Sequence, residues 1–155
     1  MSLFESFLSQ FQKAFIVDSR WKIFLKGFVN TMIITLAAAA IGILIGVVIA
    51  VFRYMASQKD PRKKRTFGSV VIGVIDRLMA AYVAVIRGTP LAIQPMIMAF
   101  IVLRGVSDGM VVAIVAFGLN SGAYVSEVIR AGIQSVDGGQ MEAGRSLGLN
   151  RVDAM

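Results

Sequence analysis

The sequence lacks two of the side chains on which much protein chemistry depends. None of its 155 residues is cysteine or histidine. Without cysteine there are no disulfides, thiolate metal sites or cysteine nucleophiles. Without histidine there is no Ser-His-Asp triad and no imidazole ligand for zinc. We therefore expect no metal site and no cofactor, and we expect that the chain is not an enzyme.

Charge is also scarce, and the charge that remains is mostly positive. Charged residues make up 16% of the chain, against about 25% in a typical soluble domain. Hydrophobic residues make up 57%, and the mean hydropathy is +0.75. A soluble fold of this size could not bury so much apolar surface. The composition predicts an all-α, polytopic membrane protein in a lipid bilayer, and the excess of Lys and Arg indicates membrane orientation rather than nucleic-acid binding.

Long apolar runs predict three membrane spans. Residues 27–52 contain no charge, and a helix needs about 20 residues to cross the ~30 Å hydrocarbon core. Residues 81–103 and 109–127 are the second and third predicted spans. Within the first span, small residues recur every four positions and predict a ridge on which another helix can pack closely. These residues are Ala38, Gly42, Gly46 and Ala50.

Residues 1–26 form an amphipathic lead before the first span. The helical period places its apolar side chains on one face. They are Phe4, Phe7, Leu8, Phe11 and Phe15. Such a helix can lie in the membrane interface, or it can pack on neighbouring helices.

Residues 66–103 allow two interpretations. One is a single long helix, bent near Pro90 or Pro95, whose later part, 81–103, spans the membrane. The other is a hairpin that turns at Gly88-Thr89-Pro90, which leaves a second arm of about 24 Å, short for a span. The single bent helix is preferred because it keeps the basic residues of the C-terminal tail on the cytoplasmic side.

The distribution of basic residues predicts the orientation. Residues 53–65 hold six lysines and arginines against Asp60 alone, which is typical of a cytoplasmic loop. With that loop inside, the N-terminus is outside and the tail from residue 131 is inside. Nine Lys and Arg residues then lie inside and five outside, in agreement with the positive-inside rule.

Several polar residues fall within or beside the apolar runs. Arg87 either faces protein or a water-filled path, with carbonyls freed by Pro90 as candidate acceptors, or it extends to the interface. A polar stripe in the third span either lines a substrate path or makes hydrogen bonds between helices. Its members are Asn120, Ser121, Tyr124 and Glu127. Arg130, three residues beyond Glu127, can form an ion pair with it.

Three motifs resemble those of a known family, the permease subunits of ABC importers for polar amino acids. The first is Arg87-Gly88-Thr89-Pro90-Leu91 with Gln94, and the second is Asn120-Ser121-Gly122-Ala123-Tyr124 with Glu127 and Arg130. The third, Glu142-Ala143-Gly144 followed by Gly148, resembles the Glu-Ala-Ala coupling motif with Gly144 in place of an alanine. Together the motifs span residues 87–148, in the order that the family has them.

The resemblance implies a type-1 importer transmembrane domain over 27–155, with a partial coupling loop over 131–155. It implies that Glu142, Ala143, Gly144 and Gly148 contact a cytoplasmic ATP-binding subunit. It places Arg87, Thr89, Pro90, Gln94, Asn120, Ser121, Tyr124 and Glu127 at the translocation path or its gate. The chain has no G-x-x-x-x-G-K-[ST] motif, so ATP hydrolysis is expected in a partner.

The resemblance also implies further partners and a location. They are a second permease copy or paralogue, an extracytoplasmic amino acid-binding protein, and the bacterial inner membrane. The family's coupling motif continues past residue 155 and is followed by two more spans, so the chain is expected to be the N-terminal three-fifths of a permease, unable to transport alone. The alternative is a small membrane scaffold or accessory subunit without a transport role.

Overall fold

The computed structural model describes residues 3–57 and 66–150, and every regular element in these two ranges is a helix. The elements are α1 (Leu3–Phe11), η1 (Gln12–Ile16), η2 (Val17–Ser19), α2 (Trp21–Ser57), α3 (Phe67–Gly88), α4 (Ile93–Ile97), η3 (Met98–Val102), α5 (Gly109–Gln134) and α6 (Gly138–Ser146). Helices α2, α3 and α5 are long and apolar enough to cross a membrane. The predicted all-α class with three span-length helices is therefore confirmed. The basic residues predicted for the loop at 59–65 lie outside the described residues.

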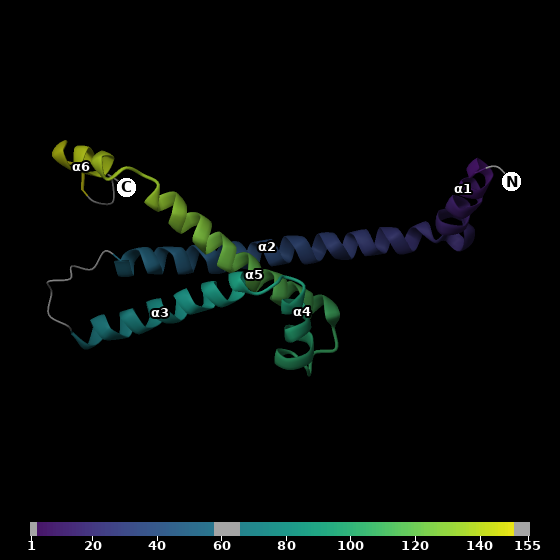
Figure 1. Cartoon of the computed structure of the whole chain (residues 1–155), viewed down its shortest axis with the longest axis horizontal. Coiled ribbons are helices and arrows are strands. Elements are labelled where there is room, and N and C mark those ends of the chain that lie inside the picture. Colours follow the sequence, from purple (N-terminus) through teal and green to yellow (C-terminus); the bar gives the residue numbers. More distant parts are fainter. Residues whose placement is uncertain (1–2, 58–65, 151–155) are drawn as a thin grey trace.

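Helix α2 forms the long axis of the molecule (Figure 1). Helix α5 crosses the middle of α2, and α3 runs along its second half. The end of α2, the start of α3 and helix α6 all lie at one end of the molecule, whereas α1 lies at the other. The two helix ends that flank the predicted cytoplasmic loop therefore lie at the same end as α6, which belongs to the predicted cytoplasmic tail.

Close packing of α2 on α5 depends on glycines in both helices. A Cβ at Gly42 would lie 2.4 Å from Oγ of Ser121, and one at Gly46 would lie 2.6 Å from Cβ of Val125. Glycines of α5 make equally close contacts with α2, because a Cβ at Gly122 would lie 2.8 Å from Cγ2 of Ile45. Ala38 and Ala50, the outer members of the predicted ridge, are buried on the same helix. The ridge thus faces α5, because small residues allow two backbones to approach.

The range predicted as the second span, 81–103, is not a single helix. Helix α3 ends at Gly88, and α4 begins only at Ile93. Thr89 is extended, at φ −102° and ψ 140°, because the ring of Pro90 disfavours helical geometry in the residue before it. Pro95 causes no break because it sits in the first turn of α4, where no donor is needed. The preferred single bent helix is therefore wrong, and the span-length element is α3 itself.

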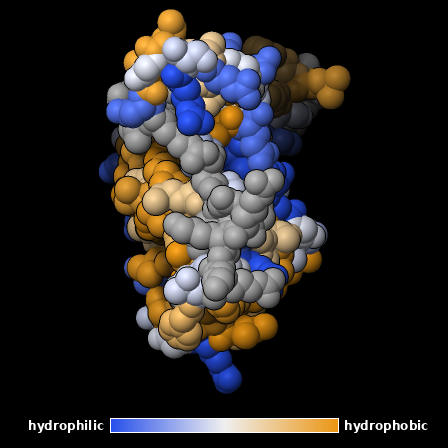
Figure 2. Space-filling model, turned by 90° about the vertical axis from the view of Figure 1, so that its left-hand side faces the viewer, coloured by the Kyte–Doolittle hydropathy of each residue, from blue (hydrophilic) through white to orange (hydrophobic). Residues whose placement is uncertain are grey.

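Most apolar side chains of the three long helices remain exposed. In the most apolar 18-residue stretch of each helix, only 22% of the residues of α2, 6% of those of α3 and 33% of those of α5 are buried within the chain. Most of the apolar surface of these helices therefore faces outward. In Figure 2, which views the end that carries α6, hydrophobic residues cover the left flank and hydrophilic residues gather towards the top, where α6 lies. Such a surface suits lipid or further membrane helices rather than water.

Candidate functional site

Gln94 joins the three polypeptide segments that meet at the break between α3 and α4. Its side chain is buried, and its amide group donates to the carbonyl oxygen of Ile86 at 2.7 Å and to Oγ1 of Thr89 at 3.0 Å. Its Oε1 accepts a hydrogen bond from Asn120 of α5 at 2.9 Å. A helix end inside a membrane needs such partners, because no water satisfies its free carbonyls. Gln94 therefore holds α3, α4 and α5 together at the break.

The Gln94→Leu variant is expected to lower the free energy of unfolding by about 2 kcal/mol, because the Ile86 carbonyl and the Asn120 amide lose their partner. The measurement is an SDS titration of the purified chain in detergent micelles. Asn120→Leu removes only one of these bonds and should have about half the effect. The double variant should lose no more than Gln94→Leu; full additivity of the two losses would contradict a shared network.

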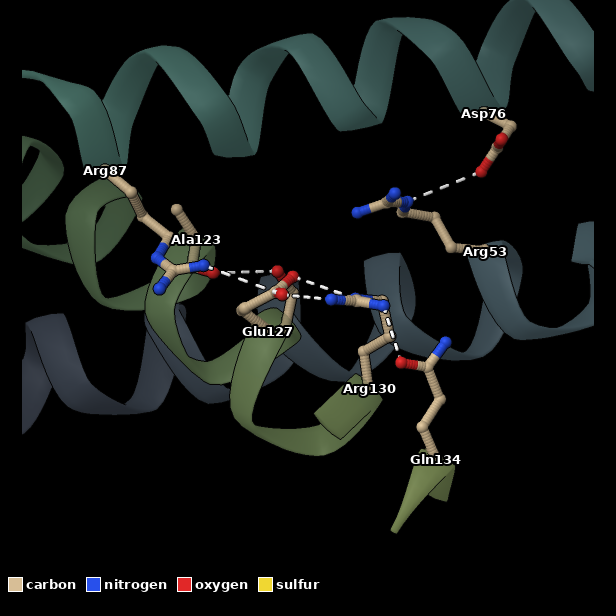
Figure 3. A network of polar contacts seen from close by, with 8 residues as sticks. Arg53, Asp76, Arg87, Ala123, Glu127, Arg130 and Gln134 are labelled. Carbon is tan, nitrogen blue, oxygen red and sulfur yellow. Dashed lines mark hydrogen bonds and ion pairs between the residues drawn. The ribbon is translucent and has the colours of Figure 1, made fainter. Parts of the chain in front are cut away.

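Glu127 is the centre of an ion-pair network on α5 (Figure 3). Its carboxylate accepts two hydrogen bonds from Arg130, one of them from Nε at 3.0 Å. Arg87, at the end of α3, places Nη1 3.7 Å from the same carboxylate and its guanidinium 5.3 Å from the ring centre of Tyr124. Arg130 also donates to Gln134 at 2.7 Å. The network therefore runs from the end of α3 to the last residue of α5.

A second ion pair links α2 to α3. Nε of Arg53 lies 3.4 Å from Oδ1 of Asp76, and both side chains are partly exposed (Figure 3). In the sequence, Arg53 belongs to a basic loop and Asp76 interrupts an apolar run. Their 23-residue separation spans the loop between two helices, so no local spacing rule identifies the pair.

Two faces of α5 have different chemistry. Asn120, Tyr124 and Glu127, spaced four and three residues apart, face α3 and α4. Ser121, which the predicted stripe included, faces α2 instead, opposite Gly42. The stripe therefore divides into a polar face towards the break and a small-residue face towards α2.

The acceptor of Arg87 differs from the predicted one, a carbonyl freed by Pro90. Gln94 donates to the carbonyls at the break, and Arg87 pairs with Glu127.

A groove of about 480 Å³ opens between the first halves of α2 and α5. Its wall is mainly apolar, with three hydroxyl groups. Its lining residues are Thr31, Ile34, Thr35, Ala38, Ala39, Phe117 and Ser121. Thr31 already donates to the carbonyl of Gly27 within its own helix. Among the lining residues, Ser121 is the one that belongs to the predicted path.

Helix α6 contains three of the four predicted coupling residues, the fourth, Gly148, lies just beyond its end, and the helix stands apart from the bundle (Figure 1). Glu142 and Ala143 are exposed, and Gly144 is partly exposed. Asp137 caps the start of the helix by accepting from the backbone of Gly139 at 2.9 Å. Caps of this kind stabilise short helices that gain little from packing.

The end of α6 is a Schellman motif centred on Gly148. The amide of Leu149 donates to the carbonyl of Gly144, and the amide of Gly148 donates to that of Arg145. Gly148 has φ +88°, a conformation that glycine adopts without penalty. The glycine of the predicted coupling motif therefore ends the helix.

Span-length helices, a small-residue interface and ion pairs within the bundle define a polytopic membrane subunit. The family model for binding-protein-dependent transport system inner membrane components matches residues 67–155. The chain belongs to this family, and it is thus a multi-pass component of the inner membrane.

Individual proteins show the same relationship. The chain is 39% identical over 124 residues to the putative glutamine transport system permease protein GlnP of Rickettsia bellii, covering 78% of this chain and 52% of that protein. It is 40% identical over 128 residues to the arginine transport system permease protein ArtQ of Bacillus subtilis, covering 81% and 52%. The chain spans about half the length of these curated relatives.

A solved structure extends the likeness to three dimensions. The crystal structure of an amino acid ABC transporter with histidines aligns with a TM-score of 0.70 and 33% identity. The alignment covers 96% of this chain and 60% of that one. The α2–α3–α5 arrangement is therefore a fold that this transporter shares.

Proposed function

We propose that the chain acts as a permease subunit of an ATP-driven amino acid importer and forms part of the path of its substrate. The observation that carries the proposal is that α5 has a polar face and leads directly into α6, an exposed and capped helix. Relatives named as permeases for glutamine and arginine support an amino acid as the substrate class. A charged substrate needs polar groups at membrane depth, and this face supplies them.

Five of the eight predicted path residues divide into two proposed roles. Arg87 and Tyr124 are exposed on the polar face, so they are positioned to contact a substrate. Gln94 is buried and bonded on both sides, so its role is to position the break rather than to touch the substrate. Thr89 and Pro90 determine where α3 ends and thereby where Arg87 lies.

The proposal includes an orientation in the membrane. Helix α6, the end of α2 and the start of α3 lie at one end of the molecule (Figure 1). The sequence between α2 and α3 is rich in lysine and arginine, which supports the assignment of this end to the cytoplasm, with the N-terminus outside. We infer that α6 meets a cytoplasmic ATP-binding subunit, and that a second permease chain and an extracytoplasmic binding protein complete the importer.

The Glu142→Lys variant tests the coupling role. Purification of the tagged chain from its native membrane should recover a subunit with a P-loop, identified by mass spectrometry. Glu142→Lys should reduce the recovery of that subunit at least tenfold, because it replaces an exposed negative charge of α6 by a positive one. A tenfold change in affinity corresponds to about 1.4 kcal/mol.

The control is Gln140→Lys, which adds a lysine to the other side of the same helix. It should leave recovery close to that of the unmodified chain. Membrane insertion of both variants is checked by their membrane-bound yield. If Glu142→Lys recovers as much of the P-loop subunit as the unmodified chain does, the coupling role is contradicted. Co-purification of an unrelated complex without any ATPase would favour a scaffold.

A further inference from the structure

The N-terminal segment presents an apolar face that nothing in the described part of the chain covers. Helix α1 has four large apolar side chains on one face, at exposures of 42–69%. These are Phe4, Phe7, Leu8 and Phe11. No residue of α1 is buried. A face of this size would be unfavourable in water.

The backbone turns α1 away from α2. Asp18 and Ser19 both have left-handed geometry, at φ 55° and 54°, which ends the helical path before Trp21. Figure 1 shows α1 lying across the axis of α2 rather than continuing it. If α2 crosses the bilayer, a helix across its axis lies along the bilayer surface.

Stacked rings connect the apolar face of α1 to α2. The ring centres of Phe11 and Phe15 are 4.9 Å apart, and those of Phe15 and Phe24 are 4.8 Å apart. Phe24 lies in the first turn of α2 and is itself 56% exposed. The apolar face of α1 is therefore continuous with the outward-facing surface of a helix long and apolar enough to span the membrane.

Residues typical of the membrane interface lie at the same junction. Trp21, the chain's single tryptophan, begins α2, and Lys22 lies 5.9 Å from its ring centre. Lys26 follows one turn later, and Arg20 precedes them. Aromatic and basic residues in this combination mark the level of the lipid headgroups.

We propose that α1 lies in the membrane interface, with its phenylalanine face in the upper acyl chains and its polar face in water, and that the bilayer itself is its partner. The turn at Asp18–Ser19 gives α1 its direction, and the Phe15–Phe24 stack aligns its face with the lipid surface of α2. The proposal concerns a lipid contact and does not depend on the transport function.

Single cysteines test the proposal directly, because the chain has none of its own. Leu8→Cys and Ser6→Cys are two residues apart and lie on nearly opposite sides of α1. Each full-length variant carries a nitroxide label and is reconstituted in vesicles of phosphatidylethanolamine and phosphatidylglycerol. Collision with oxygen, which concentrates in lipid, is compared with collision with a water-soluble nickel chelate.

The ratio of oxygen to nickel collision should be several-fold higher for Leu8→Cys than for Ser6→Cys. Equal ratios, with nickel reaching both labels, would overturn the proposal because α1 would then be in water. An immobile Leu8→Cys label protected from both reagents would also overturn it, because a protein surface would then cover the face.

A second set of variants keeps the test independent of position 8. The Phe7→Glu/Phe11→Glu pair should lift α1 from the lipid and lower the ratio at a Phe4→Cys label several-fold. The matched control, Ser6→Glu/Ser9→Glu, adds the same charge to the polar side and should leave that ratio unchanged. An unchanged ratio in the phenylalanine variant would contradict a lipid contact.

Discussion

The Gly42→Leu variant is expected to lower the free energy of unfolding by about 3 kcal/mol or more, because it forces α2 away from α5. Even the first atom of a new side chain would lie 2.4 Å from Oγ of Ser121 and 3.2 Å from the backbone nitrogen of Gly122. Ser121 has a short side chain, and the α5 backbone behind it cannot yield. The expected measurement is the midpoint of unfolding in an SDS titration of the chain in micelles.

The same helix supplies the control for this substitution. A Cβ at Gly27 would meet no atom within 4 Å, so Gly27→Leu tests helix propensity and added bulk without overpacking. It should leave the midpoint unchanged or raise it, because glycine is a poor helix former. If Gly42→Leu and Gly27→Leu unfold alike, the glycine contact with α5 does not hold the helices together.

The Glu127→Gln variant is expected to lower the free energy of unfolding by about 3 kcal/mol. Its carboxylate serves both Arg87 and Arg130, so neutralising it leaves two guanidinium groups beside apolar helices without their counter-ion. The loss should be larger than that from Gln94→Leu, where the affected groups are uncharged. Unfolding in micelles is again the measurement.

A double-mutant cycle separates the two partners of Glu127. Arg130→Gln should lower stability in the unmodified chain and have little further effect in the Glu127→Gln background, because two hydrogen bonds join the pair. Arg87→Gln should show weaker coupling, because its nitrogen lies 3.7 Å from the carboxylate and its side chain is 41% exposed. Coupling energies near zero for both arginines would contradict the network.

Local spacing is sufficient to predict some of these features. A four-residue repeat of small side chains predicts a packing ridge, and the structure places that ridge against α5. The pair at Glu127 and Arg130 also follows from helix geometry, since residues three apart are neighbours. The matching glycines of α5, Gly118 and Gly122, have the same four-residue spacing, but the sequence-based prediction placed Gly122 only within a motif.

Contacts between distant segments could not be predicted in this way. The partner of Asp76 is 23 residues away, and Gln94 joins α3 to Asn120 across 26 residues. Nothing in the composition of either segment selects these pairs. The prediction of one bent helix over 66–103 is wrong for a different reason: Pro90 ends α3 through its effect on Thr89, whereas Pro95, an equal candidate in the sequence, lies in the first turn of α4 and causes no break.

The glycine interface has a consequence for how the helices hold their register. Both α2 and α5 repeat their small residues every four positions, so a slide of four residues, about 6 Å, would bring glycine again to an equivalent place. Shape alone therefore distinguishes poorly between neighbouring registers. The register of α2 on α5 is instead determined by α3. This helix is joined to α2 by the ion pair of Arg53 and Asp76, and to α5 by the hydrogen bond from Tyr82 to the carbonyl of Leu119. Helix α3 buries little apolar surface of its own, yet its directional polar contacts fix the translation of the other two.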